Sequence, residues 1–397
     1  MKQTENRLRK ALHRFADLVR HELRSALKDE GTLLVLVAAP LIYATLYSIA
    51  YGAEVLRNVP IGVIDESRTA ASRALVAEFD AGPNCYVACE PTDMAEARAL
   101  FFDRRIYGIA YIPADYEERL LGGRQAVVPL YLDASYFLVY RQVFQELAAT
   151  LLTTGTVVGL QRLLAEGAEL PVAEAAARPV AYIGTSLFNP SLGYASFVMP
   201  AVLLLILQQT LLVGVGMVGG TWRERRRYRL LLPADGGRPN VAGITAARGT
   251  AYLLLYLPTT LYLFAVHYRL FHLPMNGATG PVVLFLGLYL AAAVAFALAL
   301  STLFRTREAP LVWLLWCSIP LLMLSGISFP RESMPAWLYG LGRLVPSSHA
   351  IDGFVRLQTM GASLGEVAEE TAWLAAMTLV YGGAAMCGLR RRIDREG

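Results

Sequence analysis

The sequence predicts a membrane α-helical protein with six transmembrane helices and an extracytoplasmic α/β domain inserted between the first and second spans. Three observations lead to this fold class. Of 397 residues, 55% are hydrophobic and only 17% are charged, against about 25% charged residues in soluble domains. The charges are missing from long runs and concentrated between them. One intervening segment, residues 54–190, is long enough to form a soluble domain.

Six runs contain no Asp, Glu, Lys or Arg, and each is close to the ~20 residues that cross a bilayer as a helix. Because backbone groups in lipid must be hydrogen-bonded internally, we interpret each run as a transmembrane helix rather than as a buried helix of a soluble core. The six runs are residues 31–53, 191–222, 249–268, 270–304, 309–330 and 371–389. A shorter uncharged stretch, residues 147–161, is rich in Thr and Gly, and we assign it to a long amphipathic helix outside the membrane.

The distribution of Lys and Arg predicts the orientation, since cytoplasmic loops of membrane proteins carry an excess of them. With the N-terminus inside, the inner segments hold 21 of the 36 basic residues in a small part of the chain. Both termini are therefore predicted to be cytoplasmic. The inner segments are then residues 1–30, 223–248, 305–308 and the tail 390–397.

Residues 1–30 form the first cytoplasmic segment and contain an amphipathic pattern. Apolar residues recur at helical spacing at Leu8, Leu12, Phe15 and Val19, and most basic side chains lie off this stripe. A basic amphipathic helix beside a span is typical of the membrane interface. The alternative is a solvated helix that packs on a protein partner.

Residues 54–190 show alternating strand and helix patterns, which favour an α/β sheet domain. Thr92 or Asp93 is expected to cap the second helix. No Gly-rich phosphate loop follows a strand. We expect strands at 60–65, 85–89, 107–112 and 127–133, and helices at 69–79, 92–105, 114–121 and 135–166.

Two further segments connect the later spans. Residues 223–248 begin with a run of arginines followed by a turn-rich stretch at 233–237, which predicts a short cytoplasmic helix ended by a loop. The arginines could bind lipid headgroups or dock a cytoplasmic partner. Residues 328–366 contain two apolar pieces, 334–345 and 347–359, too short and too interrupted by proline to span; they suit interfacial or re-entrant helices.

Several chemistries are excluded or disfavoured by the residues present. The net charge of +4 is too small to indicate nucleic-acid binding, and a lysine-based phosphate loop is impossible because no lysine follows Lys28. No catalytic or metal-binding pattern occurs. Cys85 and Cys89 lie in a predicted strand, where they would be too far apart to bridge, although a loop would permit a disulfide.

The predicted spans carry no acidic or basic residue on which a proton or Na⁺ could move, which disfavours an ion-coupled transporter. They do contain Gln208 and Gln209 near the middle of the second span. These amides are expected to serve as hydrogen-bonding contacts between helices, and the alternative is that they line a path for an amphiphilic substrate.

The layout and a set of short motifs resemble the ABC-2 type transporter permeases, the membrane subunits of ABC exporters with a large periplasmic domain. Each motif is short, but their order and placement agree over most of the chain. The motifs are Val59–Asp65 with Ser67, Tyr107–Pro113 with Tyr116, Leu130–Ser135, Phe188–Pro190, Ser325–Pro330 with Met334-Pro335, and Pro346–Gly353. After the second span, Arg223–Pro233 keeps the start of the family segment but lacks its Gly-Thr and second Glu.

The resemblance implies an export permease for a hydrophobic or amphiphilic substrate, located in the bacterial inner membrane. The chain itself would be no enzyme and hold no cofactor, because ATP would be used by a separate cytoplasmic ABC ATPase. Further implied partners are a second permease copy or paralogue, a periplasmic adaptor protein and membrane lipid. The residues expected to couple to the ATPase are Arg223, Glu224, Arg225, Arg226, Arg227, Tyr228 and Arg229.

A membrane receptor with a ligand-binding periplasmic α/β domain is the alternative function. A receptor needs an output domain on the cytoplasmic side, and the largest predicted inner segment has about 30 residues, well below the usual size of a domain. The sequence therefore favours the transporter.

Overall fold

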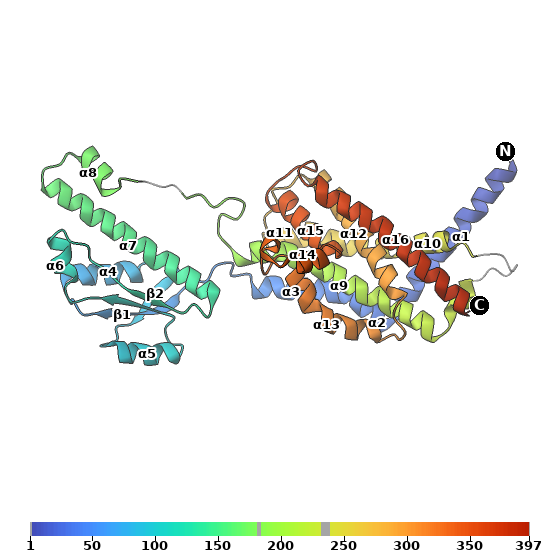
Figure 1. Ribbon diagram of the computed structural model, residues 1–397, viewed down its shortest axis with the longest axis horizontal. Coiled ribbons are helices and arrows are strands. Elements are labelled where there is room, and N and C mark those ends of the chain that lie inside the picture. The colour runs from blue at the N-terminus through green and yellow to red at the C-terminus, as the bar shows by residue number, and fades with distance from the viewer. Residues whose placement is uncertain (1, 181–183, 232–238, 397) are drawn as a thin grey trace. The chain divides into compact units, whose positions relative to one another are not determined.

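The computed structural model describes residues 2–180, 184–231 and 239–396 and contains two compact units (Figure 1). The helical unit consists of Met1–Glu54 and Ser186–Gly397, and the α/β unit of Val55–Thr185. The sequence predicted an inserted domain at 54–190, so its bounds agree to within a few residues.

The α/β unit is built on a four-stranded sheet with the strand order β2-β1-β3-β4. β1 pairs in parallel with β2 and β3, and β4 runs antiparallel to β3. The strands are β1 (Val59–Asp65), β2 (Cys85–Cys89), β3 (Gly108–Ile112) and β4 (Leu130–Leu132). The helices are α4 (Ala70–Asp80), α5 (Met94–Phe102), α6 (Tyr116–Leu121), α7 (Phe137–Ala165) and α8 (Leu170–Ala177).

Alternation along β1 divides the core of this unit between the two faces of the sheet. Ile61 and Val63 pack with residues of α4 and α7 on one face, whereas Ile64 packs with residues around α5 on the other. Figure 1 shows α4 and α7 on one side of the sheet and α5 on the opposite side. The predicted α/β pattern of this segment is therefore confirmed.

Local contacts resolve two choices that the sequence left open. Asp93 caps α5, because its side chain accepts a hydrogen bond from the N–H of Glu96. Cys85 and Cys89 are the two ends of β2 and are free thiols. The strand interpretation was correct, and it explains why these cysteines are not bridged.

The helical unit contains the remaining helices, several of which are continuous with one another. α2, a π-helical stretch η1 and α3 together cover Glu30–Ala50, and α10, the π-helical η3 and α11 cover Val241–Leu270. The bounds are α1 (Lys2–Leu27), α2 (Glu30–Leu33), η1 (Leu34–Ala38), α3 (Ala39–Ala50), α9 (Tyr194–Glu224), η2 (Arg227–Leu231), α10 (Val241–Leu261), η3 (Tyr262–His267), α11 (Tyr268–Leu270), α12 (Thr279–Ser301), α13 (Ala309–Leu324), η4 (Arg331–Ser333), α14 (Ala336–Gly342), α15 (Pro346–Phe354), η5 (Val355–Thr359) and α16 (Ala368–Glu396).

Among the described residues, six helices are long and apolar enough to cross a membrane. Five of them coincide with predicted spans. The predicted span 309–330 contains α13, which has only 16 residues, or about 24 Å at 1.5 Å per residue. The charge-free run overestimated the length of this helix. The chain turns at Gly326, which has a φ of 87°, but no charged residue lies between the helix and this turn.

The sixth helix is α7, which the sequence placed outside the membrane. Its length and composition would also allow it to span. In the structure Val143 and Leu147 are fully buried in the core of the α/β unit. The first half of α7 is therefore part of this unit.

The core of the helical unit is organised around α9, which packs against α3, α12, α13 and α15. α15 is short, yet most of its side chains are buried. The sequence left open whether the pieces of 328–366 are interfacial or re-entrant. α15 packs against α9, α12 and α16, and the choice between the two arrangements stays a prediction.

The last residue of the helical unit before the insertion, Glu54, is bonded to the start of α9. The carboxylate of Glu54 accepts hydrogen bonds from the N–H of Ser196 at 3.0 Å and from its hydroxyl at 2.6 Å. The N–H of Tyr194 donates to the Glu54 carbonyl at 2.8 Å. Glu54 thus fastens the end of the first span to the first turn of α9, whose backbone N–H groups lack helical partners.

Candidate functional site: the arginine-rich end of the helical unit

The predicted coupling residues lie where α9 ends. Arg223 and Glu224 form its last turn, Arg226 has a φ of 47°, and the chain then forms the 3-10 helix η2. Residues 241–248, which the sequence counted in the same segment, are the start of α10. The expected short helix is therefore a single 3-10 turn. The predicted loop at 233–237 lies outside the described residues.

Close backbone packing fixes the end of α9 against the turn between α12 and α13. A Cβ on Gly220 would lie 2.2 Å from the carbonyl oxygen of Thr306, and one on Gly219 would lie 2.9 Å from Ser301. Arg223 donates from Nη1 to the carbonyls of Leu303 and Phe304, each at 3.4 Å. The helix end and this turn are consequently held together by backbone contact that only glycine permits.

Tyr228 is the one predicted coupling residue that is buried rather than available to a partner. Only 1% of it is exposed, and its ring lies 5.8 Å from that of Trp222. Its hydroxyl donates to the Gly219 carbonyl at 3.4 Å. Burial raises the pKa of Tyr228, so the hydroxyl stays protonated. Tyr228 anchors η2 to α9 and is not available to a partner. Docking by its exposed neighbours stays a prediction.

A buried ion pair next to Trp222 was not anticipated from the sequence. Arg248 donates from Nε to Oε1 of Glu22 at 2.8 Å, and the Tyr252 hydroxyl donates to the same oxygen at 3.0 Å. The Arg248 guanidinium also lies 5.3 Å from the centre of the Trp222 ring. The sequence did contain a signal of a buried acidic residue. Glu22 follows Val19 by three residues and so lies on the apolar stripe of α1.

Glu22 and its neighbours attach α1 to the helical unit. Val19 packs against Ala247 and Ala251 of α10, and Ala26 joins the main core. The apolar stripe of this stretch therefore faces protein, as in the alternative that the sequence left open. Placement of α1 at the membrane interface stays a prediction.

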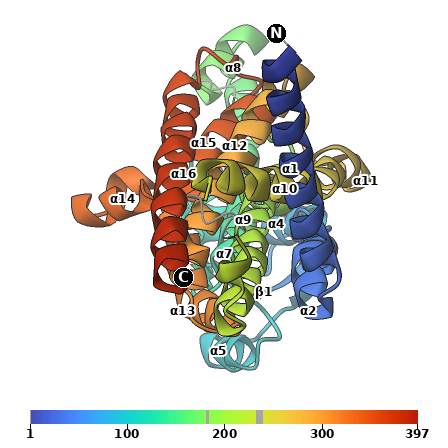
Figure 2. The same cartoon turned by 90° about the vertical axis from the view of Figure 1, so that its right-hand side faces the viewer.

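Arginines gather on the surface around this anchored turn. Arg225, Arg226 and Arg305 are exposed, as are arginines at the end of α16. Arg223 lies close enough to Arg305, Arg392 and Arg395 for their charges to repel one another. Arg307 is instead paired with Asp29, at 2.5 Å between Nη2 and Oδ1. Figure 2 looks onto this end of the helical unit, with the C-terminus of α16 in front.

The two glutamines of the predicted substrate path differ in their surroundings. Gln208 is fully buried and bonds twice to Ser347, accepting from its N–H at 2.8 Å and donating to its hydroxyl at 3.1 Å. Gln209 is partly exposed. Gln208 thus joins α9 to α15, the packing role that the sequence favoured, and a substrate path along these residues stays a prediction.

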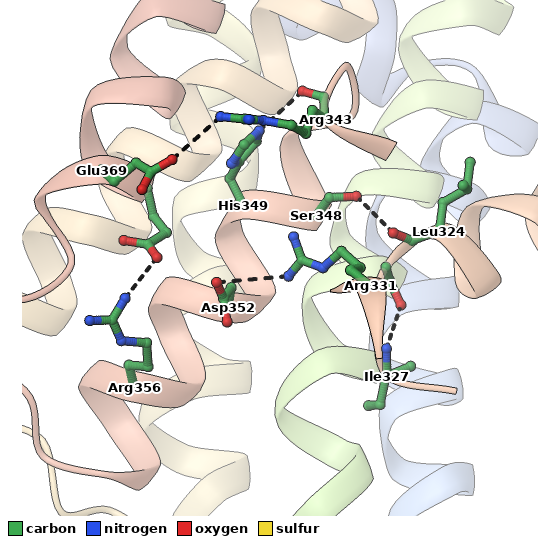
Figure 3. A network of polar contacts seen from close by, with 11 residues as sticks. Leu324, Ile327, Arg331, Arg343, Ser348, His349, Asp352, Arg356 and Glu369 are labelled. Atoms are coloured by element: carbon green, nitrogen blue, oxygen red, sulfur yellow. Dashed lines mark hydrogen bonds and ion pairs between the residues drawn. The ribbon is translucent and has the colours of Figure 1, made fainter. Parts of the chain in front are cut away.

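A second polar network lies at the other end of α13 and α16 (Figure 3). Arg343 contacts Glu369 at 3.4 Å and lies 4.5 Å from the Trp373 ring, on which His349 also stacks. Arg356 bonds Glu370 at 2.8 Å. Each arginine drawn there faces a carboxylate, so the network ties the α14–α15 region to α16. Of the residues named here, only His349 lies in a motif noted from the sequence, Pro346–Gly353.

No group of three His, Cys, Asp or Glu side chains within the described parts of the chain could hold a metal ion.

Comparison with known proteins gives the family of the chain. The sequence pattern of the family described as ABC-2 family transporter protein matches residues 31–386, so the chain belongs to this family. It is a transmembrane permease of the ABC transporter class, and such a permease works with a partner ATPase. The chain is similar to the "probable multidrug ABC transporter permease YbhR" of Escherichia coli, in strain K12 and in O157:H7. The identity is 24% over 382 residues, which cover 96% of this chain and 99% of the relative.

Proposed function

We propose that this permease is the membrane subunit of an ATP-driven exporter in the bacterial inner membrane. It would move a hydrophobic or amphiphilic substrate out of the cytoplasm or the membrane. Family membership supports transport, and the similarity to a permease whose name refers to multidrug transport supports a hydrophobic substrate. The chain would carry no cofactor, because the partner subunit would bind and hydrolyse ATP.

The proposed orientation places both termini and the arginine-rich end in the cytoplasm, and the α/β unit on the extracytoplasmic side. The excess of Lys and Arg in the inner segments supports it. A test is a variant with alanine at all four native cysteines and the change Arg178→Cys in the α/β unit. A thiol reagent that cannot cross membranes should label it in cells with a permeabilised outer membrane. Labelling only after the inner membrane is disrupted would contradict the orientation.

The observation that carries the proposed coupling is the anchoring of the exposed arginines to the helices beneath them. η2 is fixed through Tyr228 and Trp222 to α9, and Trp222 contacts Arg248, which binds α1 through Glu22. An ATPase that binds at Arg225–Arg227 would therefore act on α1, α9 and α10 together. Movement of a docked ATPase could then shift spans that are otherwise free of charge.

The assembly proposed for transport contains two permeases, either two copies of this chain or a copy and a paralogue, each with an ATPase. A periplasmic adaptor protein would extend the path on the α/β side. Substrate would pass at Gln209 rather than Gln208, because both ends of the Gln208 amide are bonded to Ser347.

The coupling is tested by co-purification of the ATPase with the full permease. The triple reversal Arg225→Glu, Arg226→Glu and Arg227→Glu should lower the recovered ATPase at least about tenfold, since like charges would replace favourable ones. A matched control reverses three exposed arginines of the α/β unit, Arg98, Arg105 and Arg178. The purified permease alone should hydrolyse no ATP. ATP hydrolysis by the permease itself, or equal recovery of the ATPase with both triple variants, would contradict the proposal.

A further inference from the structure

The end of α16 is not a loose tail. The sequence assigned residues 390–397 to a cytoplasmic tail, whereas the helix continues to Glu396. Leu389 and Ile393, one helical turn apart, are 2% and 1% exposed and pack in one cluster with Trp222 and Tyr228. The last turns of α16 therefore lie directly against η2.

Polar contacts fix the same turns. Arg392 donates to the carbonyl of Thr302 from Nε at 2.9 Å and from Nη2 at 2.7 Å. Arg223 donates to the next two carbonyls of that turn. Arg392 therefore occupies the C-terminus of α12, where a helix favours a cation. The ends of α9 and α16 are held on one turn and form one packed piece.

The residues of this piece carry an excess of positive charge. Residues 223–229, 305–308 and 390–396 contain eleven arginines and four acidic residues. Arg390, Arg391 and Arg395 are exposed, and the contact of Arg390 with Asp394 is long, at 4.0 Å with both side chains about two-thirds exposed. Arg223 is in addition repelled by the charges of Arg305, Arg392 and Arg395. An acidic partner would relieve that repulsion.

We propose that Arg390, Arg391 and Arg395 form, with Arg225 and Arg226, one composite surface that docks an acidic face of the partner ATPase. This inference rests on the proposed function and adds a second docking element to it. Guanidinium groups suit carboxylates because they bind them in a bidentate manner. An ATPase seated here would contact the last spanning helix directly, and not only the connection between α9 and α10.

Anionic lipid headgroups are a weaker fit for this surface. The charge-free run of α16 ends at Leu389, and Arg395 lies about 9 Å further along the helix at 1.5 Å per residue. The headgroup layer is only about 5–8 Å deep on each side of the hydrocarbon core. Arg395 thus lies beyond the headgroups, where a soluble protein can reach it, whereas Arg390 and Arg391 lie at headgroup depth.

The test is the triple reversal Arg390→Glu, Arg391→Glu and Arg395→Glu in the full permease, co-expressed with its ATPase. Recovery of the ATPase should fall at least about tenfold, whereas the three Arg→Lys changes, which keep the charge but not the bidentate geometry, should lower it less. The variant should fold, because the buried Leu389 and Ile393 and the hydrogen-bonded Arg392 are unchanged. The reversal of Arg98, Arg105 and Arg178 serves again as the charge-matched control, and thermal unfolding in detergent reports on folding.

The outcomes separate this inference from the proposed function. If reversal at Arg225–Arg227 releases the ATPase and reversal at Arg390, Arg391 and Arg395 does not, the composite surface is wrong and the coupling role stands. If neither releases it, both fail. If the α16 variant keeps its ATPase but loses retention on vesicles rich in phosphatidylglycerol, the surface binds lipid and the inference is overturned.

Discussion

Glu22 and Arg248 lie 226 residues apart in the chain and form a buried ion pair with 2.8 Å between Oε1 and Nε. Their side chains are 3% and 6% exposed, whereas those of the Asp17–Arg20 pair on the same helix are 72% and 71% exposed. Both pairs have their acidic residue on α1, but one is buried and reaches α10 whereas the other is exposed and local, so the exposed pair serves as the comparison.

Removing one partner of the buried pair should release α1. We expect Glu22→Ala to lower the free energy of unfolding by about 3–5 kcal/mol, because it leaves the Arg248 charge buried and unpaired. Asp17→Ala should change it by less than about 1 kcal/mol. Thermal unfolding in detergent and proteolytic release of residues 1–27 would measure both. Equal effects of the two substitutions would contradict the role given to Glu22.

Gly220 should tolerate no side chain. We expect Gly220→Ala to destabilise the permease by about 1–3 kcal/mol, because its Cβ would overlap backbone rather than a flexible side chain. Gly287 in the middle of α12 is the control, since a Cβ there meets nothing within 4 Å. Gly287→Ala should be neutral or slightly stabilising. The melting temperatures of the two variants in one detergent check this, and an unchanged Gly220→Ala protein would refute the close packing.

Gln208 should act on stability and Gln209 on transport. Replacing Gln208 by Leu leaves the N–H of Ser347 without its acceptor, which should cost about 1–3 kcal/mol. Gln209→Leu should leave the melting temperature unchanged and alter transport of an amphiphilic dye by the assembled exporter. A Gln208→Leu protein of normal stability would remove the proposed link between α9 and α15.

The two cysteines of β2 should react at different rates. Burial and the nearby Glu146 carboxylate raise the pKa of Cys85 to about 12, whereas the pKa of Cys89 is raised mainly by partial burial. A raised pKa leaves less thiolate at pH 8, so iodoacetamide should label Cys89 well before Cys85. Mass spectrometry of the native protein checks the order. Recovery of a Cys85–Cys89 disulfide would contradict the strand.

The charge pattern predicted those parts of the fold in which lipid excludes charged side chains. Five spans and the inserted domain follow from where charges are excluded, because lipid tolerates few of them. The same rule misplaced helix ends. It extended α13 beyond Leu324, where Gly326 ends the helix, and it began the third span after Arg248, which is buried within α10.

Pairings between distant segments could not be predicted. Nothing in the local sequence of Glu22 specifies Arg248 as its partner, and the Gln208–Ser347 bond joins residues 139 apart. The helical end of α16 was closer to prediction, since Leu389 and Ile393 are four residues apart and mark one helix face. The arginines between them concealed that pattern by suggesting a solvated tail.

The bond between Glu54 and Ser196 has a consequence for modularity. Because it holds Glu54 against the first turn of α9, the helical unit is joined to itself on both sides of the insertion without the help of residues 55–185. A segment attached in this way can be lost, exchanged or enlarged without rethreading the spans. The helical unit is therefore held together independently of the inserted α/β unit. Glu54 is the position that any shortened or chimaeric version should retain.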